Sequence, residues 1–262
     1  MQQNLKIFDK IDRTISTNDS MYQGNEDHYF FVGYSALKCI FFALETSGKD
    51  PSQIKTILDL PSGYGRVIRW IQAGFPDAEI TACDLDTEAV NFCNKQFGVD
   101  KIFSHEDPDK IQTAKKFDLI WCGSLFTHLN SEFWEKFLSF FEKFLNPDVI
   151  LLFTTHGSYV AFRGQNGFDY GLKPEQFENL IKNFSSSGFG YENYPNTSGY
   201  GITLSKPSFV MRLLESHQDF RIILYLEKGW DHHQDVVACF KDTRFKEISS
   251  DYCNEFTQLF GR

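Results

Sequence analysis

The stretch over residues 57–69, ILDLPSGYGRVIR, constrains the fold more than any other part of the chain. Its first residues are mostly apolar, as in a parallel strand that is covered on both faces. Gly63 and Gly65 follow in a tight turn, and a helical pattern begins directly after them. Such a turn exposes backbone N–H groups at a helix N-terminus, where a polar or negatively charged group can bind. The stretch therefore predicts a strand–turn–helix unit that holds a nucleotide-like ligand.

A second unit of the same kind follows along the chain. Residues 79–84 (EITACD) predict a strand that ends in an acid, Asp84, and residues 87–97 predict a helix. Asp84 follows the glycine turn by about 20 residues, the separation expected across one strand–helix–strand unit. A carboxylate at that position can accept hydrogen bonds from the hydroxyl groups of a ribose. The two units together predict a Rossmann-like sheet.

The residues at the ends of three predicted strands resemble successive motifs of the class I S-adenosylmethionine-dependent methyltransferases, and their order and spacing match as well. The matching residues are Asp59, Pro61, Ser62, Gly63, Tyr64 and Gly65, then Cys83, Asp84 and Leu85, then residues 117–121 (FDLIW). The resemblance implies that the chain uses S-adenosyl-L-methionine to methylate an acceptor. The sequence departs from the family pattern at Pro61, which replaces the first glycine and has no N–H to donate.

The resemblance also implies roles for single residues. The turn with Gly63 and Gly65 holds the methionine part of the cofactor, Asp84 binds both ribose hydroxyls, and Leu85 packs on the adenine. Glu106 and Asp107 follow the third predicted strand, where family members often contact the adenine amino group; solvated loop charges are the alternative. The full set of predicted cofactor-binding residues is Tyr29, Gly33, Asp59, Pro61, Ser62, Gly63, Tyr64, Gly65, Asp84, Leu85, Asp107, Gly123 and Ser124.

A nicotinamide-binding Rossmann domain, and with it a nicotinamide-dependent reductase, is the nearest alternative. Its fingerprint requires a third glycine three residues after the second, for close packing of helix on strand. Ile68 stands at that place. This mismatch and the hairpin predicted at the end of the chain favour the methyltransferase. A non-catalytic protein that only binds S-adenosylmethionine is a further alternative.

The remaining pattern predicts further strands and helices, and the resemblance implies that they form an α/β fold with a Rossmann-like, seven-stranded, mostly parallel sheet, helices on both faces and a C-terminal antiparallel hairpin strand. Asn130 or Ser131 caps one helix, and Asn146 and Pro147 end it. Residues 1–262 are expected to form a single methyltransferase domain. The other predicted elements are helices over 34–44 and 208–216 and strands over 101–104, 117–122, 149–155, 221–226 and 236–240.

Two segments outside the sheet are predicted to cover the site. The N-terminal region, about residues 1–45, resembles the helical lid of small-molecule methyltransferases, with Tyr22, Tyr29 and Gly33 as lid residues. Aromatic core under a helix is the alternative reading of this region. An insertion over about residues 158–205 is rich in glycine and aromatic residues and contains one predicted helix over 174–184. It is expected to cover the acceptor site, with a second small aromatic core as the alternative.

Histidines are the candidate catalytic residues. Methyl transfer to a hydroxyl group requires a base, and histidine, with a pKa near 6.5, suits that role at neutral pH. The candidates, in order, are His128, His233 and His156, which follow the fourth strand, the final hairpin turn and the fifth strand; ordinary cap or turn histidines are the alternative. Asp231, His232 and His233 resemble a metal-ligand cluster, but adjacent histidines usually diverge, so no metal is predicted.

The composition of the chain limits the classes of molecule that it can bind. A net charge of −9 argues against nucleic acid as the substrate. Six cysteines without a C-x-x-C pair indicate reduced core thiols and a cytoplasmic protein, and the N-terminal stretch has no apolar core of a signal peptide. No membrane-spanning segment is predicted. The predicted acceptor is therefore a small molecule. A hydroxyl group of a saccharide or natural product is favoured, and nitrogen and carbon acceptors stay open. The oligomeric state is not predicted.

Overall fold

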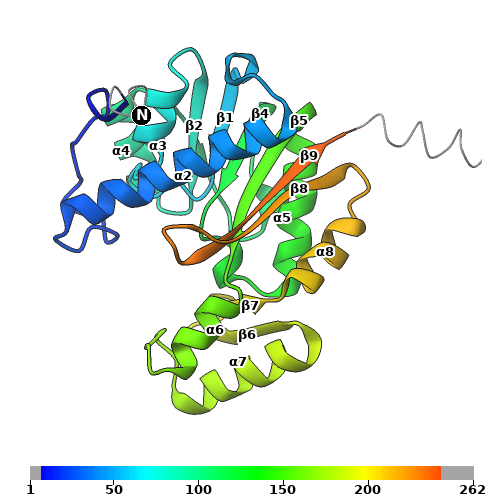
Figure 1. Ribbon diagram of the computed structural model, residues 1–262. Helices are drawn as coiled ribbons and strands as arrows, with labels where there is room; N and C mark the ends of the chain where they lie inside the picture. Colours follow the sequence, from blue (N-terminus) through cyan, green and yellow to red (C-terminus); the bar gives the residue numbers. More distant parts are fainter. Residues whose placement is uncertain (1–6, 243–262) are drawn as a thin grey trace, which may run out of the picture.

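Seven strands form one sheet in the order β3-β2-β1-β4-β5-β9-β8 in the computed structural model, which describes residues 7–242 (Figure 1). The first five strands pair in parallel, and β9 is antiparallel to both β5 and β8. This is the predicted fold class. The strands are β1 Thr56–Asp59, β2 Glu79–Asp84, β3 Asp100–Phe103, β4 Phe117–Cys122, β5 Leu145–Thr155, β8 Phe220–Trp230 and β9 Gln234–Lys241.

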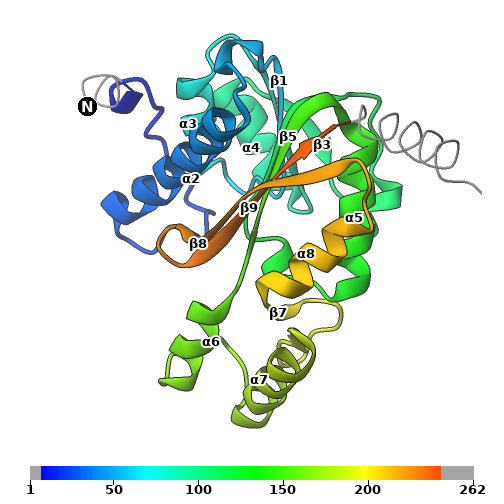
Figure 2. The ribbon, with the colours of Figure 1, turned by 45° about the vertical axis from the view of Figure 1, so that its right-hand side comes forward.

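Helices cover both faces of this sheet, because alternate strand residues point to opposite sides. Ile57 packs in the cluster under α2 and α3, whereas Leu58 packs in the cluster under α5 and α8. Figures 1 and 2 show α2 crossing the first face. The helices are α2 Glu26–Ser47, α3 Ile68–Gly74, α4 Thr87–Phe97, α5 Ser131–Phe144 and α8 Pro207–Glu215, with short 3-10 helices η1 Pro51–Gln53, η2 Pro108–Lys110 and η3 Phe126–His128.

The predicted elements are confirmed most closely where local signals are strong. The strands over 79–84 and 117–122 and the helix over 87–97 have the predicted bounds. The Asn130 side chain accepts a hydrogen bond from Phe133 N–H and so caps α5, as predicted. The strand over 101–104 and the helix over 208–216 are each shifted by one residue, and the strand predicted at the start of the 57–69 stretch is β1.

Two predicted boundaries are wrong. The helix expected over 34–44 begins at Glu26, because the Asn25 side chain caps it by accepting from His28 N–H. Asn146 and Pro147 do not end α5; they lie within β5, which begins at Leu145. The pairing of β4 with β5 shifts register there, and a bulge can hold a proline that donates no ladder hydrogen bond.

The insertion after β5 forms a layer of its own beyond the carboxyl ends of the parallel strands (Figure 1). It contains α6 Ser158–Gln165, α7 Pro174–Ser187 and an antiparallel pair, β6 Phe189–Asn193 with β7 Gly201–Ser205. Only α7 was predicted. A small core, including Val160, Leu180 and Leu204, holds these elements together.

The N-terminal helix α2 is apolar along its whole length. It is the one described helix long and apolar enough to cross a membrane, with a mean hydropathy of 1.2 in its best window. In the fold, 56% of that window is buried, and Trp230 Nε1 donates a hydrogen bond to the Val32 carbonyl. The apolar surface of α2 is therefore used in packing on the sheet. Residues 1–6 of the predicted lid lie outside the described residues.

Candidate active site

A cavity of about 440 Å³ lies at the carboxyl ends of β1, β2 and β4. In an open α/β sheet this edge, where the strand order reverses, is where ligands bind. Five residues predicted from sequence share its wall: Pro61, Asp84, Leu85, Ser124 and His128. The structure thus brings the candidate ribose acid and the first-ranked candidate base to one cavity.

The glycine turn is fixed by its backbone. Gly63 has φ 49° and Gly65 has φ 79°, in the left-handed region that favours glycine. A Cβ at Gly65 would also lie 2.4 Å from the Phe97 ring. The Gly63 N–H donates a 2.7 Å hydrogen bond to one oxygen of Asp84, whose other oxygen accepts from Asp86 N–H at 2.9 Å. The turn and the acid are therefore held together as one unit.

Within residues 7–242, the side chains of Asp59 and Arg66 beside this turn make no hydrogen bond or salt bridge. Asp59 is 1% exposed, and neither carboxylate oxygen accepts a hydrogen bond. Burial and the nearby Asp84 raise its pKa well above the ordinary value. Arg66 follows the turn, and its guanidinium lies 5.9 Å from the Tyr29 ring and 6.0 Å from the Trp230 ring, without a carboxylate within 4.0 Å. A zwitterionic ligand would satisfy both groups.

One end of the cavity is apolar and suits a flat ring. Leu85 is 57% exposed, and it lines the cavity together with Leu125, Leu129, Phe133 and Phe137. Of the two acids after β3, Glu106 lies in the wall. Asp107 instead caps η2, where its side chain accepts from Asp109 N–H.

Other predicted cofactor residues have packing roles that the structure makes visible. Tyr64 packs on the Phe92 ring, with centroids 5.7 Å apart. Ser62 is buried, and its N–H donates to the Cys83 carbonyl. A Cβ at Gly123 would lie 2.7 Å from the Trp121 ring, so this position must be small. Tyr64, Ser62 and Gly123 therefore pack around the turn and the loop after β4 but do not line the cavity.

The N-terminal segment is anchored beside the same edge. Tyr29 is buried, and its hydroxyl donates a 2.5 Å hydrogen bond to Asp19. Arg69 donates to the carbonyls of Asp12 and Thr14, which ties the segment before α2 to α3. A Cβ at Gly33 would lie 2.3 Å from the Arg66 carbonyl, so Gly33 serves the close contact of α2 with α3.

The three candidate histidines lie in a row. The ring centroids of His128 and His156 are 6.3 Å apart, and those of His156 and His233 are 5.5 Å apart. Burial lowers the pKa of each below the ordinary histidine value; His128 and His233 lower that of His156 further, and Arg163 that of His233. All three rings are therefore neutral at neutral pH.

His128 is held in one tautomer. Its Nδ1 lies 2.8 Å from the Gly201 carbonyl oxygen, which can only accept, so Nδ1 carries the proton. Nε2 of the neutral ring is left with a free lone pair. Because His128 lines the cavity, it has the chemistry of a general base.

The β6–β7 loop of the insertion reaches this cavity. Ser198, Gly199 and Tyr200 line it, and the Tyr200 ring stacks on His128 with centroids 4.9 Å apart. The Tyr194 hydroxyl lies 3.3 Å from His128 Nδ1. Tyr191 instead donates to Asn193 within the hairpin. Tyr200 and Arg66 were missed as site residues; the position of Arg66, directly after the glycine turn, was a signal for it.

A polar chain fixes the loop after β4. Ser124 has φ 63°, and its N–H donates to Thr154 Oγ1 at 2.7 Å. Gln234 bridges this pair, because it accepts from Thr154 Oγ1 and donates to Ser124 Oγ. The hairpin, β5 and the loop after β4 are thereby joined at the cavity wall.

The suspected metal ligands diverge. His232 stacks on the Phe31 ring, whereas His233 faces Arg163, with Nδ1 3.4 Å from Arg163 Nη1. Within residues 7–242 there is no group of three or more histidine, cysteine, aspartate or glutamate residues that could hold a metal ion.

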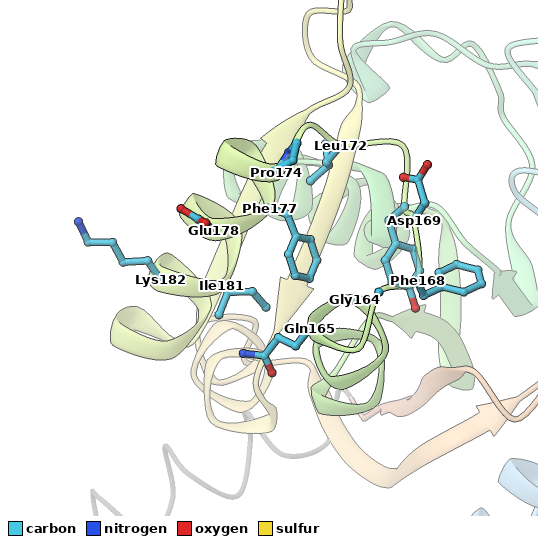
Figure 3. Close-up of a pocket in the computed structure, with 12 residues that line it drawn as sticks. Gly164, Gln165, Phe168, Asp169, Leu172, Pro174, Phe177, Glu178, Ile181 and Lys182 are labelled. Atoms are coloured by element: carbon cyan, nitrogen blue, oxygen red, sulfur yellow. The ribbon is translucent and has the colours of Figure 1, made fainter.

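A larger hollow of about 770 Å³ lies inside the insertion, between the loop after α6 and α7 (Figure 3). Phe177 and Ile181 of α7 face Phe168 and Asp169 of the loop there. None of the residues predicted to bind cofactor or to act as a base lines it. The smaller cavity beside the glycine turn is therefore the candidate active site.

Comparison with known proteins finds a methyltransferase domain within the chain. Residues 57–148 match a methyltransferase domain family. Malonyl-acyl-carrier-protein O-methyltransferase 2 of Ilyobacter polytropus is 26% identical over 116 residues, which are 44% of this chain and 44% of that relative, so the match spans less than half of its length.

Solved structures share the fold. An S-adenosylmethionine-dependent methyltransferase of Clostridium acetobutylicum is 14% identical, with a TM-score of 0.56 over 81% of this chain and 92% of its own. The 1,6-didemethyltoxoflavin-N1-methyltransferase of Burkholderia thailandensis, solved with S-adenosylhomocysteine, is 14% identical, with a TM-score of 0.55 over 80% of this chain and 78% of its own. Residues 57–148 thus match a methyltransferase domain, and the chain shares the fold of S-adenosylmethionine-dependent methyltransferases.

Proposed function

We propose that this protein transfers the methyl group of S-adenosylmethionine to a hydroxyl group of a small-molecule acceptor. The observation that carries the proposal is the shared cavity, whose wall includes both the ribose-type acid Asp84 and the base-type histidine His128. When bound, the cofactor supplies an electrophilic methyl group on its sulfonium. The chain must then hold cofactor and acceptor in line and exclude water.

Residues beside the glycine turn hold the cofactor in this proposal. Asp84 accepts hydrogen bonds from the ribose hydroxyls, and Leu85 covers the adenine. The buried Asp59 carboxylate offers a partner to the ammonium group of the methionine end, and the Arg66 guanidinium offers one to its carboxylate. The unpartnered Asp59 carboxylate supports this fit, because a buried polar group without a partner is costly.

His128 is the proposed general base. Its Nε2 takes the proton of the acceptor hydroxyl, while the Gly201 carbonyl keeps Nδ1 protonated and fixes the ring. Tyr200 and Tyr194 keep water from the ring on the side of the insertion. His156 and His233 extend the polar wall behind it.

The two outer segments are proposed as covers of one methyltransferase domain. The N-terminal segment, tied down by Arg69, closes the methionine end, and the insertion closes the acceptor side. The favoured acceptor is a saccharide or a natural product with a free hydroxyl. Five cysteines of the described chain are buried free thiols, which supports a reducing, cytoplasmic setting for this activity.

Calorimetric titration with S-adenosylmethionine and S-adenosylhomocysteine tests the cofactor. We expect micromolar binding of both, and Asp84→Asn should weaken it by roughly 1.5 to 3 kcal/mol. Asp50→Asn is the matched control, because Asp50 caps the short helix η1 and does not line the cavity. Failure of the wild-type protein to bind either compound would refute the proposal, and binding without methylation of any hydroxylated acceptor would indicate a non-catalytic binding protein.

A further inference from the structure

A group of aromatic rings and cations lies beside the histidine row, and the proposed function does not use it. We call it the basic aromatic cluster and define it as Tyr159, Arg163, Tyr170, Lys228 and His233. Helix α6 supplies the first two residues, which are four positions apart and so share one helix face. The β8–β9 hairpin supplies Lys228 and His233, opposite that face. Two segments distant in sequence therefore build the cluster.

The two cations of the basic aromatic cluster, Arg163 and Lys228, can donate further hydrogen bonds. Arg163 Nη1 lies 3.4 Å from His233 Nδ1, and the guanidinium carbon lies 3.8 Å from the Phe168 ring centroid. Lys228 Nζ lies 4.2 Å from the Tyr159 ring centroid. Neither cation has a carboxylate within 4.0 Å among residues 7–242. This is notable in a chain with 35 acidic and 26 basic residues.

The backbone that carries Lys228 is held in place. Lys228 has φ 55°, an unfavourable conformation for a residue with a Cβ. Its N–H donates a 2.9 Å hydrogen bond to the carboxylate of Asp235, which is 2% exposed and also accepts from the Tyr225 hydroxyl at 2.9 Å. Such conformations persist where the surroundings enforce them, often at ligand sites. The hairpin therefore fixes the backbone position from which the Lys228 side chain extends.

Two buried polar atoms next to the cluster lack partners in the described structure, Tyr170 Oη and His156 Nδ1. The Tyr170 ring stacks on His233 with centroids 6.1 Å apart and lies 6.3 Å from the His156 ring. A buried polar atom without a partner is costly, so a bound polar group at this place would lower the free energy. His156 in turn adjoins His128, which links the cluster to the proposed base.

We propose that the basic aromatic cluster binds the acceptor and that the acceptor is a flat molecule with a negatively charged group. Arg163 and Lys228 hold that carboxylate or phosphate, and the ring of the acceptor packs against Tyr159 and Tyr170. The proposal rests on the proposed function and adds the charge of the acceptor to it. A chain with a net charge of −9 repels anions in general, so an anionic acceptor requires local cations of this kind.

Binding of small probes tests the proposal without knowledge of the natural acceptor. The protein, with S-adenosylhomocysteine present, is titrated with 4-hydroxybenzoate, with phenyl phosphate and with the neutral 4-hydroxybenzamide. We expect at least one anion to bind roughly tenfold or more tightly than the amide. The tighter anion distinguishes a carboxylate from a phosphate acceptor.

Substitutions test whether Arg163 and Lys228 cause the preference for an anion over the neutral amide. Arg163→Gln and Lys228→Gln should each weaken binding of the preferred anion roughly tenfold and leave the amide unchanged, and Arg163→Lys should retain part of the preference. Arg212→Gln on α8 and Lys143→Gln, which removes a lysine over Phe144, are the controls. Equal binding of amide and anions, no binding of either anion, or an unchanged preference in Arg163→Gln would overturn the proposal. S-adenosylhomocysteine is titrated first, so its failure to bind is read separately and counts against the proposed function.

Discussion

The two sides of the candidate active site are built in different ways. On the cofactor side, one continuous unit supplies the glycine turn and the acid, and a backbone hydrogen bond from Gly63 to Asp84 joins them. On the proposed acceptor side, His128, Arg163 and Lys228 come from η3, α6 and the β8–β9 hairpin, and side-chain contacts assemble them. The first side is local in sequence, whereas the second depends on how distant segments pack. Cofactor binding and acceptor chemistry should therefore respond to different substitutions.

His128→Gln should give the largest separation of the two sides. Loss of the general base should lower kcat about 10² to 10⁴-fold with a hydroxylated acceptor, while S-adenosylhomocysteine binds as in the wild type. Steady-state kinetics and calorimetry measure the two quantities. His28→Gln is the matched control, because His28 is exposed and pairs with Asp231. A kcat that stays within a few-fold of wild type would remove His128 from the mechanism.

The pH profile sharpens the same comparison. Burial lowers the pKa of His128 below 6.5, so the ring is a neutral base at and above neutral pH and becomes protonated only on the acid side. We expect kcat/KM to be flat near pH 7 and to fall about tenfold per pH unit below the lowered pKa. His128→Gln should lack this acid limb. An acid limb centred above 6.5 would contradict the assignment.

The same contrast explains what the sequence could and could not predict. Helix α4 was predicted to the residue because its signals are local: Asp86 caps its start, and Gly98, with φ 68°, ends it. Asp84 was singled out by its spacing from the glycine turn, and the structure places it in the cavity wall. The β6–β7 pair was missed, because residues 189–193 (FGYEN) show no clear alternation and gain their strand form from pairing.

The predicted ends of helices and strands were wrong where nonlocal packing overrides a local signal. Pro147 indicated a helix end, yet β5 continues through it because the ladder shifts register at that point. The histidines were placed at the active edge from strand order, but their row could not be foreseen. The partner of His128, Gly201, lies 73 residues away in sequence. Arg66 lay next to a known motif and was open to prediction; the Arg163–His233 contact was not.

Asp59→Asn should change stability and cofactor binding in opposite directions. The pKa of the buried Asp59 carboxyl is raised well above 3.8, so the folded protein binds its proton more tightly than the unfolded chain does. The free energy of unfolding should therefore fall as pH rises from about 3.8 through the raised pKa. Asp59→Asn should lack this decrease in the free energy of unfolding. Without ligand at pH 7, it should be more stable than the wild type by about 1 to 2 kcal/mol.

The affinity of that variant for S-adenosylhomocysteine should nevertheless decrease, because the ammonium group loses its charged acceptor. Chemical denaturation across pH and calorimetry give the two values. Asp118→Asn serves as the comparison, since the Asp118 carboxylate already accepts hydrogen bonds from the Lys55 and Thr56 N–H groups. If Asp59→Asn destabilised the ligand-free protein as much as Asp118→Asn, the carboxylate would have a structural role instead.

Tyr200→Leu should have the smallest effect and tests where the two sides meet. The Tyr200 ring stacks on His128 at 4.9 Å and lines the cavity with Asp84, so it belongs to the insertion but touches both sides. Loss of stacking should cost about 0.5 to 1.5 kcal/mol, seen mainly as a lower kcat because the His128 ring is less well positioned. Tyr191→Leu, within the same hairpin but hydrogen-bonded to Asn193, should leave kcat unchanged. Equal losses in both variants would mean that the hairpin acts only through its own folding. A lower kcat in Tyr200→Leu alone would show that the β6–β7 loop of the insertion positions the His128 ring.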